Sequence, residues 1–508
     1  MTRKNKLKLN IITSIAFQLT TIVCGFILPK FFITYFGSAV NGLVSSITQF
    51  LGFIALCECG VGAVVQSALY EPLAKMDIVQ ISKIVISAEK FFRKVAYILL
   101  IYTICLMLFY PLITIQSFDY MYTFVLIFVI SISTFSQYYF GMTYRLLLAA
   151  DQLVFLQNII HTATLILNAV ACIALMKAGA SIQIVKLTTS LVFLMQPVLI
   201  TIIAKKKYTL DKELILTEEP IKQKWNGLAQ HIAAVVLYNT DTAVLTFLST
   251  LKNVSIYSVY NLVVNGVKLI MESQKDSMKA LFGNMLAKNE KDTLNSTFDT
   301  FEWAMHTLIT LIFTVTAMLI LQFVRVYTAK ITDANYIVPA FAYLITAANA
   351  AYCLRLPYNI MVLAAGHYKQ TQSSAIIEAL INIILSIILV FNYGLVGVAI
   401  GTLVAMLYRT IYFAIYLSKN IIYRDIRHFI KHIIIDIVTV ILIVATVKLL
   451  PNFFKMSKTN YLSWIILALK TGIFSLIIVA IVNIMFYNSN IKRLVFRMNK
   501  KQNKKECI

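Results

Sequence analysis

Long apolar stretches, separated by short polar segments, run along almost the whole chain of 508 residues. A helix needs roughly 20 predominantly apolar residues to cross the hydrocarbon core of a bilayer. By that criterion we count about 14 such stretches. The pattern therefore predicts an all-α integral membrane protein with about 14 transmembrane helices.

The apolar pattern repeats when the sequence is shifted by about 215 residues. Ala149 and Ala150 fall on Ala364 and Ala365, Gln157 falls on Gln372, and the isolated turn glycine Gly179 falls on Gly394. The repeated spans begin near Asn10, Asn41, Phe91, Met121, Gln152 and Ser181, and again near Trp225, Ile256, His306, Tyr336, His367 and Val396.

Each half of this repeat holds six spans, an even number, so both halves enter the membrane from the same side. We expect two six-helix lobes related by an axis along the bilayer normal, which is a plan found in transporters. The expected lobes are residues 1–204 and 225–420, joined by a basic cytoplasmic loop at 205–224. Two unpaired helices follow in 421–490, and residues 491–508 form a basic cytoplasmic tail.

The distribution of charge predicts the orientation. The formal net charge is +23, yet only 13% of the residues are charged and 59% are hydrophobic. Roughly 33 of the lysines and arginines fall on the side of the N-terminus, which is the positive-inside pattern and places both termini in the cytoplasm. Such basic clusters set topology and contact anionic membrane lipids, so we expect no nucleic-acid partner.

Several motifs that carry enzyme or metal chemistry are missing from the sequence. There is no P-loop, and Cys57 and Cys59 lack the second Cys/His cluster that a zinc site needs. His428 and His432 have the spacing of zinc ligands, but their basic surroundings favour an interfacial helix end. We expect no metal, no cofactor and no enzymatic activity.

Ionisable residues inside apolar spans are the candidates for function, because a charge at membrane depth is costly without a partner or a water-filled cavity. Some have alternative roles: Lys268 and Glu272 are one helical turn apart and could neutralise each other, and Lys30 could reach the interface. Glu58 and Asp241 have no cation one turn away on their own helices. The candidates are Lys30, Glu58, Asn239, Asp241, Lys268, Arg355 and Arg409.

Four segments carry a resemblance to a known family. They are residues 28–43 (LPKFFITYFGSAVNGL), Asn239-Thr-Asp241, residues 254–260 (VSIYSVY) and Leu363-Ala-Ala-Gly366. Together they resemble the polysaccharide-exporter branch of the multidrug/oligosaccharidyl-lipid/polysaccharide (MOP) transporter superfamily. The resemblance covers essentially the whole chain and implies 14 helices arranged as six, six and two.

The resemblance implies a flippase in the bacterial cytoplasmic membrane that moves a polyprenyl-pyrophosphate-linked oligosaccharide by alternating access of the two lobes. Its partners would be the lipid-linked oligosaccharide and the glycosyltransferases and polymerase of the same pathway. The cations Lys30, Lys268, Arg355 and Arg409 are then expected to hold the phosphates. Glu58, Asp241 and Asn239 are expected to gate or couple to an ion.

Two other functions remain open. A cation-coupled drug exporter of the same superfamily would favour an acidic, aromatic cavity over a basic one. A membrane-embedded glycan polymerase or ligase would need a large external loop with catalytic residues, and the external loops expected here are short.

Overall fold

The computed structural model describes residues 3–58, 60–211, 228–488 and 490. The expected basic tail at 491–508, most of the expected loop at 205–224 and the start of the seventh span near Trp225 lie outside the described residues. The chain divides into two compact units, Met1–Ile256 and Tyr257–Ile508, so the division falls inside helix α10 (Leu251–Glu272). The lobe limits at 1–204 and 225–420 remain predictions.

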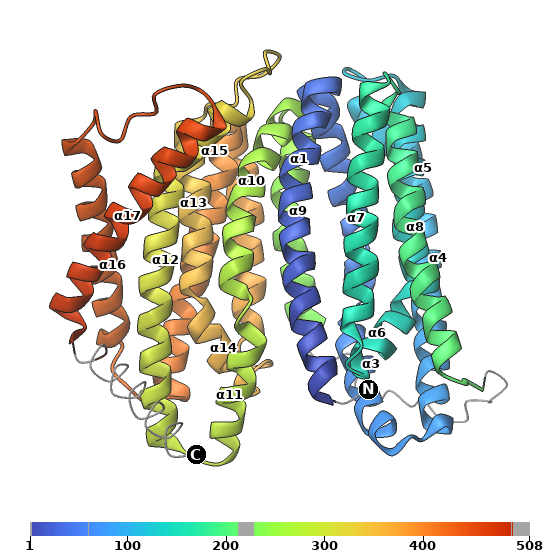
Figure 1. Ribbon diagram of the computed structural model, residues 1–508, viewed down its shortest axis with the longest axis horizontal. Coiled ribbons are helices and arrows are strands. Elements are labelled where there is room, and N and C mark those ends of the chain that lie inside the picture. The colour runs from blue at the N-terminus through green and yellow to red at the C-terminus, as the bar shows by residue number, and fades with distance from the viewer. Residues whose placement is uncertain (1–2, 59, 212–227, 489, 491–508) are drawn as a thin grey trace. The chain divides into compact units, whose positions relative to one another are not determined.

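The first unit is a bundle of long helices in which α5 packs against α4 and α8, and α7 packs against α1 and α8 (Figure 1). Buried apolar side chains from these helices form one continuous core, which includes Ile47, Phe92, Leu126 and Leu147. Its elements are α1 (Arg3–Gly52), α2 (Ala55–Glu58), α3 (Val61–Lys75), α4 (Ile78–Thr114), α5 (Tyr120–Ser136), the π-helix η1 (Gln137–Gly141), α6 (Met142–Ala150), α7 (Val154–Lys177), α8 (Ile182–Lys207) and α9 (Leu228–Leu248).

The second unit is also helical throughout its described residues, with α13 packed against α12 and α15. Helices α16 and α17 pack against α12 and against each other, at the edge of the unit (Figure 1). After α10, its elements are α11 (Lys275–Ala287), α12 (Lys291–Tyr327), α13 (Pro339–Leu354), α14 (Leu356–Ala364), α15 (Gln372–Asn420), α16 (Arg427–Leu449) and α17 (Tyr461–Phe486).

Eleven helical segments among the described residues are long and apolar enough to cross a membrane. Their outward surfaces carry large apolar side chains such as Ile101, Val170 and Phe391, each more than 60% exposed, which suits contact with lipid tails rather than water. The chain is therefore an all-α, multi-pass membrane protein, as the hydrophobic pattern predicted.

The longest of these helices change direction at glycines. Gly37 in α1 and Gly394 in α15 have φ values of 83° and 52°, which interrupt the helix. Beyond Gly394, α15 folds back on itself: the Asn382 side chain donates to Thr402 Oγ1 at 3.1 Å. A Cβ on Gly401 would lie 2.9 Å from the Ser386 backbone nitrogen, so only glycine allows the two arms to approach this closely.

The internal repeat is visible in the local structure. Gly179 and Gly394, which the shift aligns, both have positive φ, as expected for turn glycines. The aligned alanine pairs end two helices of equal length, α6 at Ala150 and α14 at Ala364. In each half, an irregular stretch therefore precedes a short helix at the same point of the repeat.

Asp151 joins three segments at one end of the first unit. Its carboxylate accepts hydrogen bonds from Lys6 and Lys207 at 2.8 Å and from the Tyr208 hydroxyl at 2.5 Å. Partial burial by itself raises the pKa of Asp151, but these three donors outweigh it, so that the pKa lies below its ordinary value. The start of α1 and the end of α8 therefore lie on the same side of this unit.

Candidate functional site

Two of the four predicted phosphate-binding cations lie around one aromatic ring in the second unit. The Lys268 ammonium group is 4.2 Å from the centroid of the Tyr352 ring, and the Arg355 guanidinium carbon is 4.7 Å from it. Lys268 comes from α10 and Tyr352 from α13, while Arg355 occupies the break between α13 and α14. This break follows from the sequence, because Pro357 cannot continue the helix hydrogen bonds of α13.

Arg409 joins this cluster through a shared carboxylate. Arg355 Nη1 and Arg409 Nη1 each lie 2.5 Å from an oxygen of Glu378, and the three side chains are 3%, 12% and 1% exposed. Both arginines therefore have an acidic partner that the sequence did not indicate. Glu378 lies on α15, so the spacing of residues within one helix could not reveal it, although it is the only acid in the long span Gln372–Asn420.

The contacts described for this cluster involve more cations than carboxylates. Lys268, Arg355 and Arg409 face two carboxylates, Glu378 and Glu272, and the Tyr352 hydroxyl donates a hydrogen bond to Glu272. Glu272 therefore contacts the ring that the cations surround, rather than serving only as the neighbour of Lys268 one turn away. Arg409 Nε is buried without a hydrogen-bond partner in the described structure, so it remains available as a donor.

The predicted acids lie in the first unit. Glu58 ends α2 near Tyr138, Arg145 and His231, and His231 Nε2 lies 2.8 Å from the carbonyl oxygen of Ala55. Asn239 and Asp241 are 7% and 3% exposed on α9.

Two cavities adjoin Tyr138 in this unit. One of about 60 Å³ is lined by Gln137, Arg145 and His161 among others, and one of about 240 Å³ lies beside Ala55. Both exceed the volume that a water molecule needs. Two neighbours of Glu58, Tyr138 and Arg145, therefore line space that water can occupy.

The fourth predicted cation, Lys30, is half-buried on α1 in the first unit. The sequence interpretation missed a second membrane-depth lysine in the first unit. Lys186 on α8 places its ammonium group 4.0 Å from the centroid of the Phe32 ring. A lysine seven residues after the turn glycine Gly179, inside an apolar span, was the available signal.

Each of the two units contains a carboxylate that interacts with a tyrosine. Tyr138 interacts with Glu58, and Tyr352 with Glu272. Glu272 follows Glu58, and Tyr352 follows Tyr138, by the same interval of 214 residues. Tyr138 lies in η1 before α6, and Tyr352 lies in the last turn of α13 before α14, so a similar polar pair recurs before the short helix of each half.

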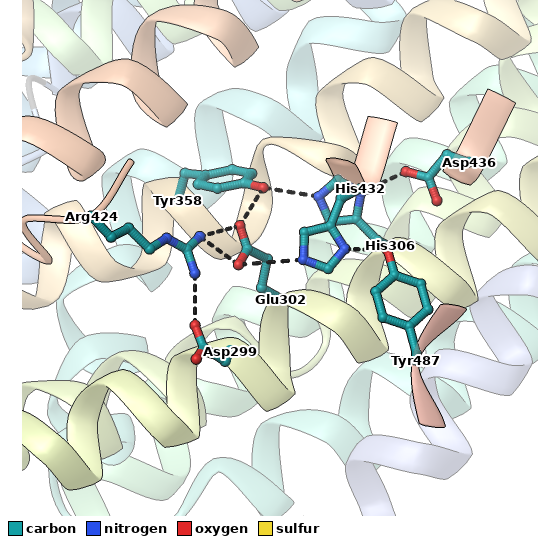
Figure 2. Close-up of polar contacts among 8 residues, drawn as sticks. All are labelled: Asp299, Glu302, His306, Tyr358, Arg424, His432, Asp436 and Tyr487. Atoms are coloured by element: carbon teal, nitrogen blue, oxygen red, sulfur yellow. Dashed lines mark hydrogen bonds and ion pairs between the residues drawn. The ribbon is translucent and has the colours of Figure 1, made fainter. Parts of the chain in front are cut away.

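A second buried network lies where α12 meets α14, α16 and the end of α17 (Figure 2). Arg424 binds both oxygens of Glu302 at 2.5 Å and Asp299 at 2.7 Å. His432 lies near the start of α16, as expected, but its side chain is buried. It is 7% exposed, and its Nδ1 lies 2.5 Å from the Tyr487 hydroxyl. The network joins Asp299, Glu302, His306, Tyr358, Arg424, His432, Asp436 and Tyr487.

This network was not predicted, although Glu302 and His306 are one turn apart at the edge of an apolar span. Among the described residues, no group of three or more His, Cys, Asp or Glu side chains is arranged to hold a metal ion.

Comparisons with known proteins place the fold. No family model matches the chain, and no curated protein matches it. A solved structure of the lipid II flippase MurJ in an inward closed conformation is similar over 95% of this chain and 100% of its own, with 17% identity and a TM-score of 0.69. The chain has the fold of the MOP-superfamily transporters.

Two further solved structures have a similar fold. An inward-facing multidrug resistance MATE family transporter is similar over 79% of this chain and 95% of its own, with 12% identity and a TM-score of 0.62. The eukaryotic MATE transporter AtDTX14 covers 84% of this chain and 98% of its own, with 14% identity and a TM-score of 0.53. All three similar proteins are transporters.

Proposed function

We propose that this protein is a flippase that translocates a polyprenyl-pyrophosphate-linked oligosaccharide across the bacterial cytoplasmic membrane, for the assembly of a surface polysaccharide. The observation that carries the proposal is the cluster of Lys268, Arg355 and Arg409, which has more cations than carboxylates. A buried site with surplus positive charge suits an anionic headgroup and disfavours a cationic drug.

The physical role of these cations follows from their position. Moving a pyrophosphate into hydrocarbon without partners would cost tens of kcal/mol by Born estimates. Arg355 and Arg409 are held in place by Glu378, and a pyrophosphate carries more charge than that carboxylate. In this proposal the headgroup replaces Glu378 as the partner of the two arginines, with the spare Arg409 Nε as a further donor, while the lipid tail stays in the bilayer.

The extent of the likeness to MurJ supports a lipid-linked substrate. MurJ is a lipid II flippase, and the similarity to it covers 95% of this chain, against 79% for the inward-facing MATE transporter. We also propose fourteen membrane crossings. Dividing α1 at Gly37 and α15 at Gly394, and counting α13 with α14 as one crossing, extends the eleven candidate spans to that number.

The acids of the first unit favour coupling of transport to an ion. Both a flippase and a drug exporter could use such coupling. Tyr138 and Arg145, which interact with Glu58, line cavities large enough for water, and Asp241 is buried. This is the specific observation that keeps a cation-coupled drug exporter as the second candidate function.

Reconstitution into proteoliposomes distinguishes the flippase from the drug exporter. Proteoliposomes containing the protein and a fluorescent polyprenyl-pyrophosphate disaccharide should expose the sugar to an external quencher faster than empty vesicles. A cationic dye loaded inside should leak no faster than from the empty vesicles. Dye efflux without lipid translocation would reject the flippase and support the drug exporter.

A further inference from the structure

The hydrogen bonds around His306 reveal where a proton resides. Arg424 binds both oxygens of Glu302, which fixes Glu302 as an ionised acceptor. Tyr358 donates its single hydroxyl proton to Glu302 at 2.7 Å. His306 Nε2 lies 2.9 Å from the same hydroxyl oxygen, and because that oxygen has already donated its proton, Nε2 must carry a hydrogen of its own.

The other nitrogen of His306 also needs a hydrogen. Nδ1 lies 2.6 Å from a carboxylate oxygen of Asp436 on α16, and a carboxylate only accepts. Both ring nitrogens are therefore donors, which makes His306 an imidazolium ion.

The surrounding charges favour one bound proton and disfavour two. Asp299, Glu302 and Asp436 face only one permanent cation of the network, Arg424, so a proton reduces the excess of negative charge (Figure 2). His432 stacks on His306 with ring centroids 4.9 Å apart, and a second imidazolium at that distance would be repelled. His432 therefore stays neutral, with its Nδ1 facing Tyr487 at the end of α17 and its Nε2 3.7 Å from Glu302.

We propose that His306 and Asp436 form a proton-binding site that fastens α16 to α12 and α14. The bound proton supplies the hydrogen for one of the two bonds of His306. Once it leaves, the ring keeps only one N–H, so a nitrogen lone pair must face either the Asp436 carboxylate or the Tyr358 oxygen. Either arrangement weakens the contact that holds α16, and with it α17, to the rest of the unit.

Asp436 is the more accessible member of the pair. His306 is 1% exposed, and the Asp436 side chain is 13% exposed. Two further side chains lie near the site. The Lys431 ammonium group is 5.7 Å from the centroid of the Tyr487 ring, and Phe429 packs against His306 with ring centroids 6.3 Å apart. This inference does not depend on which substrate the protein carries.

Nitrogen NMR of the full-length protein in detergent micelles, labelled with ¹⁵N-histidine, tests the protonation state. The chain has six histidines, and the signal lost in His306→Gln belongs to His306. At pH 7.5 that signal should show hydrogen on both nitrogens. Asp436→Asn should convert it to a neutral ring with one N–H. Asp425→Asn is the matched control, because Asp425 is exposed and pairs with Arg427 outside the network.

The same variants test whether the proton site holds α16 against α12 and α14. Amide hydrogen exchange in residues 427–449 should be about tenfold faster in Asp436→Asn than in Asp425→Asn, the effect of one lost hydrogen bond to a charged group. If His306→Gln fails to fold, the comparison of the two Asn variants identifies the His306 signal instead. A neutral His306 in the wild-type protein at pH 7.5 would overturn the proton site. Equal exchange in the two Asn variants would overturn the fastening.

Discussion

Arg355 and Glu378 form an ion pair in which both side chains are almost completely buried, with 3% and 1% of their surface exposed. A buried pair of this kind is costly to break from one side, because the remaining charge has no solvent to stabilise it. Glu378 also binds Arg409, so a single carboxylate balances two guanidinium groups. This arrangement sets separate expectations for stability and for transport.

Replacing Glu378 by Gln should destabilise the protein by about 3–5 kcal/mol, because two buried guanidinium groups lose their carboxylate. Thermal unfolding in detergent measures the change. Glu71→Gln is the control, because Glu71 is exposed and pairs only with Lys75 one turn away; it should unfold like the wild type. An unfolding temperature for Glu378→Gln equal to that of the control would show that the two arginines do not depend on Glu378.

Replacing Arg409 by Gln should impair transport more than folding. Arg355 still pairs with Glu378 in this variant, while the proposed phosphate contact is lost. We expect translocation to fall about tenfold or more, the effect of losing a hydrogen bond to a charged group. Cells should then accumulate cytoplasm-facing lipid-linked glycan at normal protein levels. Arg325→Gln, an exposed arginine on α12, is the matched control. Wild-type export by Arg409→Gln would argue against a cationic substrate site.

Asp241→Asn should slow the transport cycle more than it weakens substrate binding. The residue is 3% exposed on α9 in the first unit, whereas the basic cluster lies in the second. The variant keeps the shape of the side chain and removes its charge. Measuring the affinity for the lipid-linked substrate and the translocation rate in the same proteoliposomes separates the two effects. A loss of affinity equal to the loss of rate would assign Asp241 to binding instead of coupling.

The lowered pKa of Asp151 predicts that the folded protein loses stability in acid. Its pKa is lowered in the folded protein, so its contribution is fully present above the ordinary aspartate pKa of about 3.9. That contribution is lost as the pH falls through the lower, folded value. The effect should be no more than about 1 kcal/mol, because the carboxylate is partly exposed. The unfolding temperatures of the wild type and Asp151→Asn should differ at pH 7 and converge below about pH 4. A constant difference between pH 7 and pH 3 would contradict this.

The positive-inside distribution predicts that residues near 205–224 are cytoplasmic and that the turn between α16 and α17 is external. Thr209 and Ser457 are both exposed, so cysteines introduced there are accessible to reagents. In intact cells, a membrane-impermeant thiol reagent should label Ser457→Cys and leave Thr209→Cys unlabelled until the cells are opened. The opposite labelling would reverse the orientation.

The hydrophobic pattern located the helices because each span must bury its own backbone hydrogen bonds in the bilayer, which leaves a strong local signal. Gly179 and Gly394 mark turns at aligned positions, and Ala150 and Ala364 end helices within one residue of alignment. The partners of the charged residues left no such signal. Glu378 reaches Arg355 and Arg409 only through the packing of α13, α14 and α15, and periodicity within a helix carries no information on that packing.

Similarly, His432 looked like part of a basic surface because its sequence neighbours are basic. Its actual neighbours, Glu302, His306 and Tyr487, come from the middle and the end of the second unit. The environment of His432 is therefore determined by tertiary contacts and not by the composition of the neighbouring sequence. One-sequence reasoning could identify Glu302 and His306 as unusual residues inside a span, but it could not pair them with α16.

The reversal of α15 at Gly394 also constrains how this part of the chain enters the membrane. The bond between Asn382 and Thr402 joins the two arms across a short polypeptide turn, and Gly401 lets their backbones touch. An arm inserted alone would expose the Asn382 amide to lipid, where no water can solvate it. During synthesis, the two arms are therefore best delivered to the bilayer together, as a preformed helical hairpin that leaves the translocation machinery as one piece.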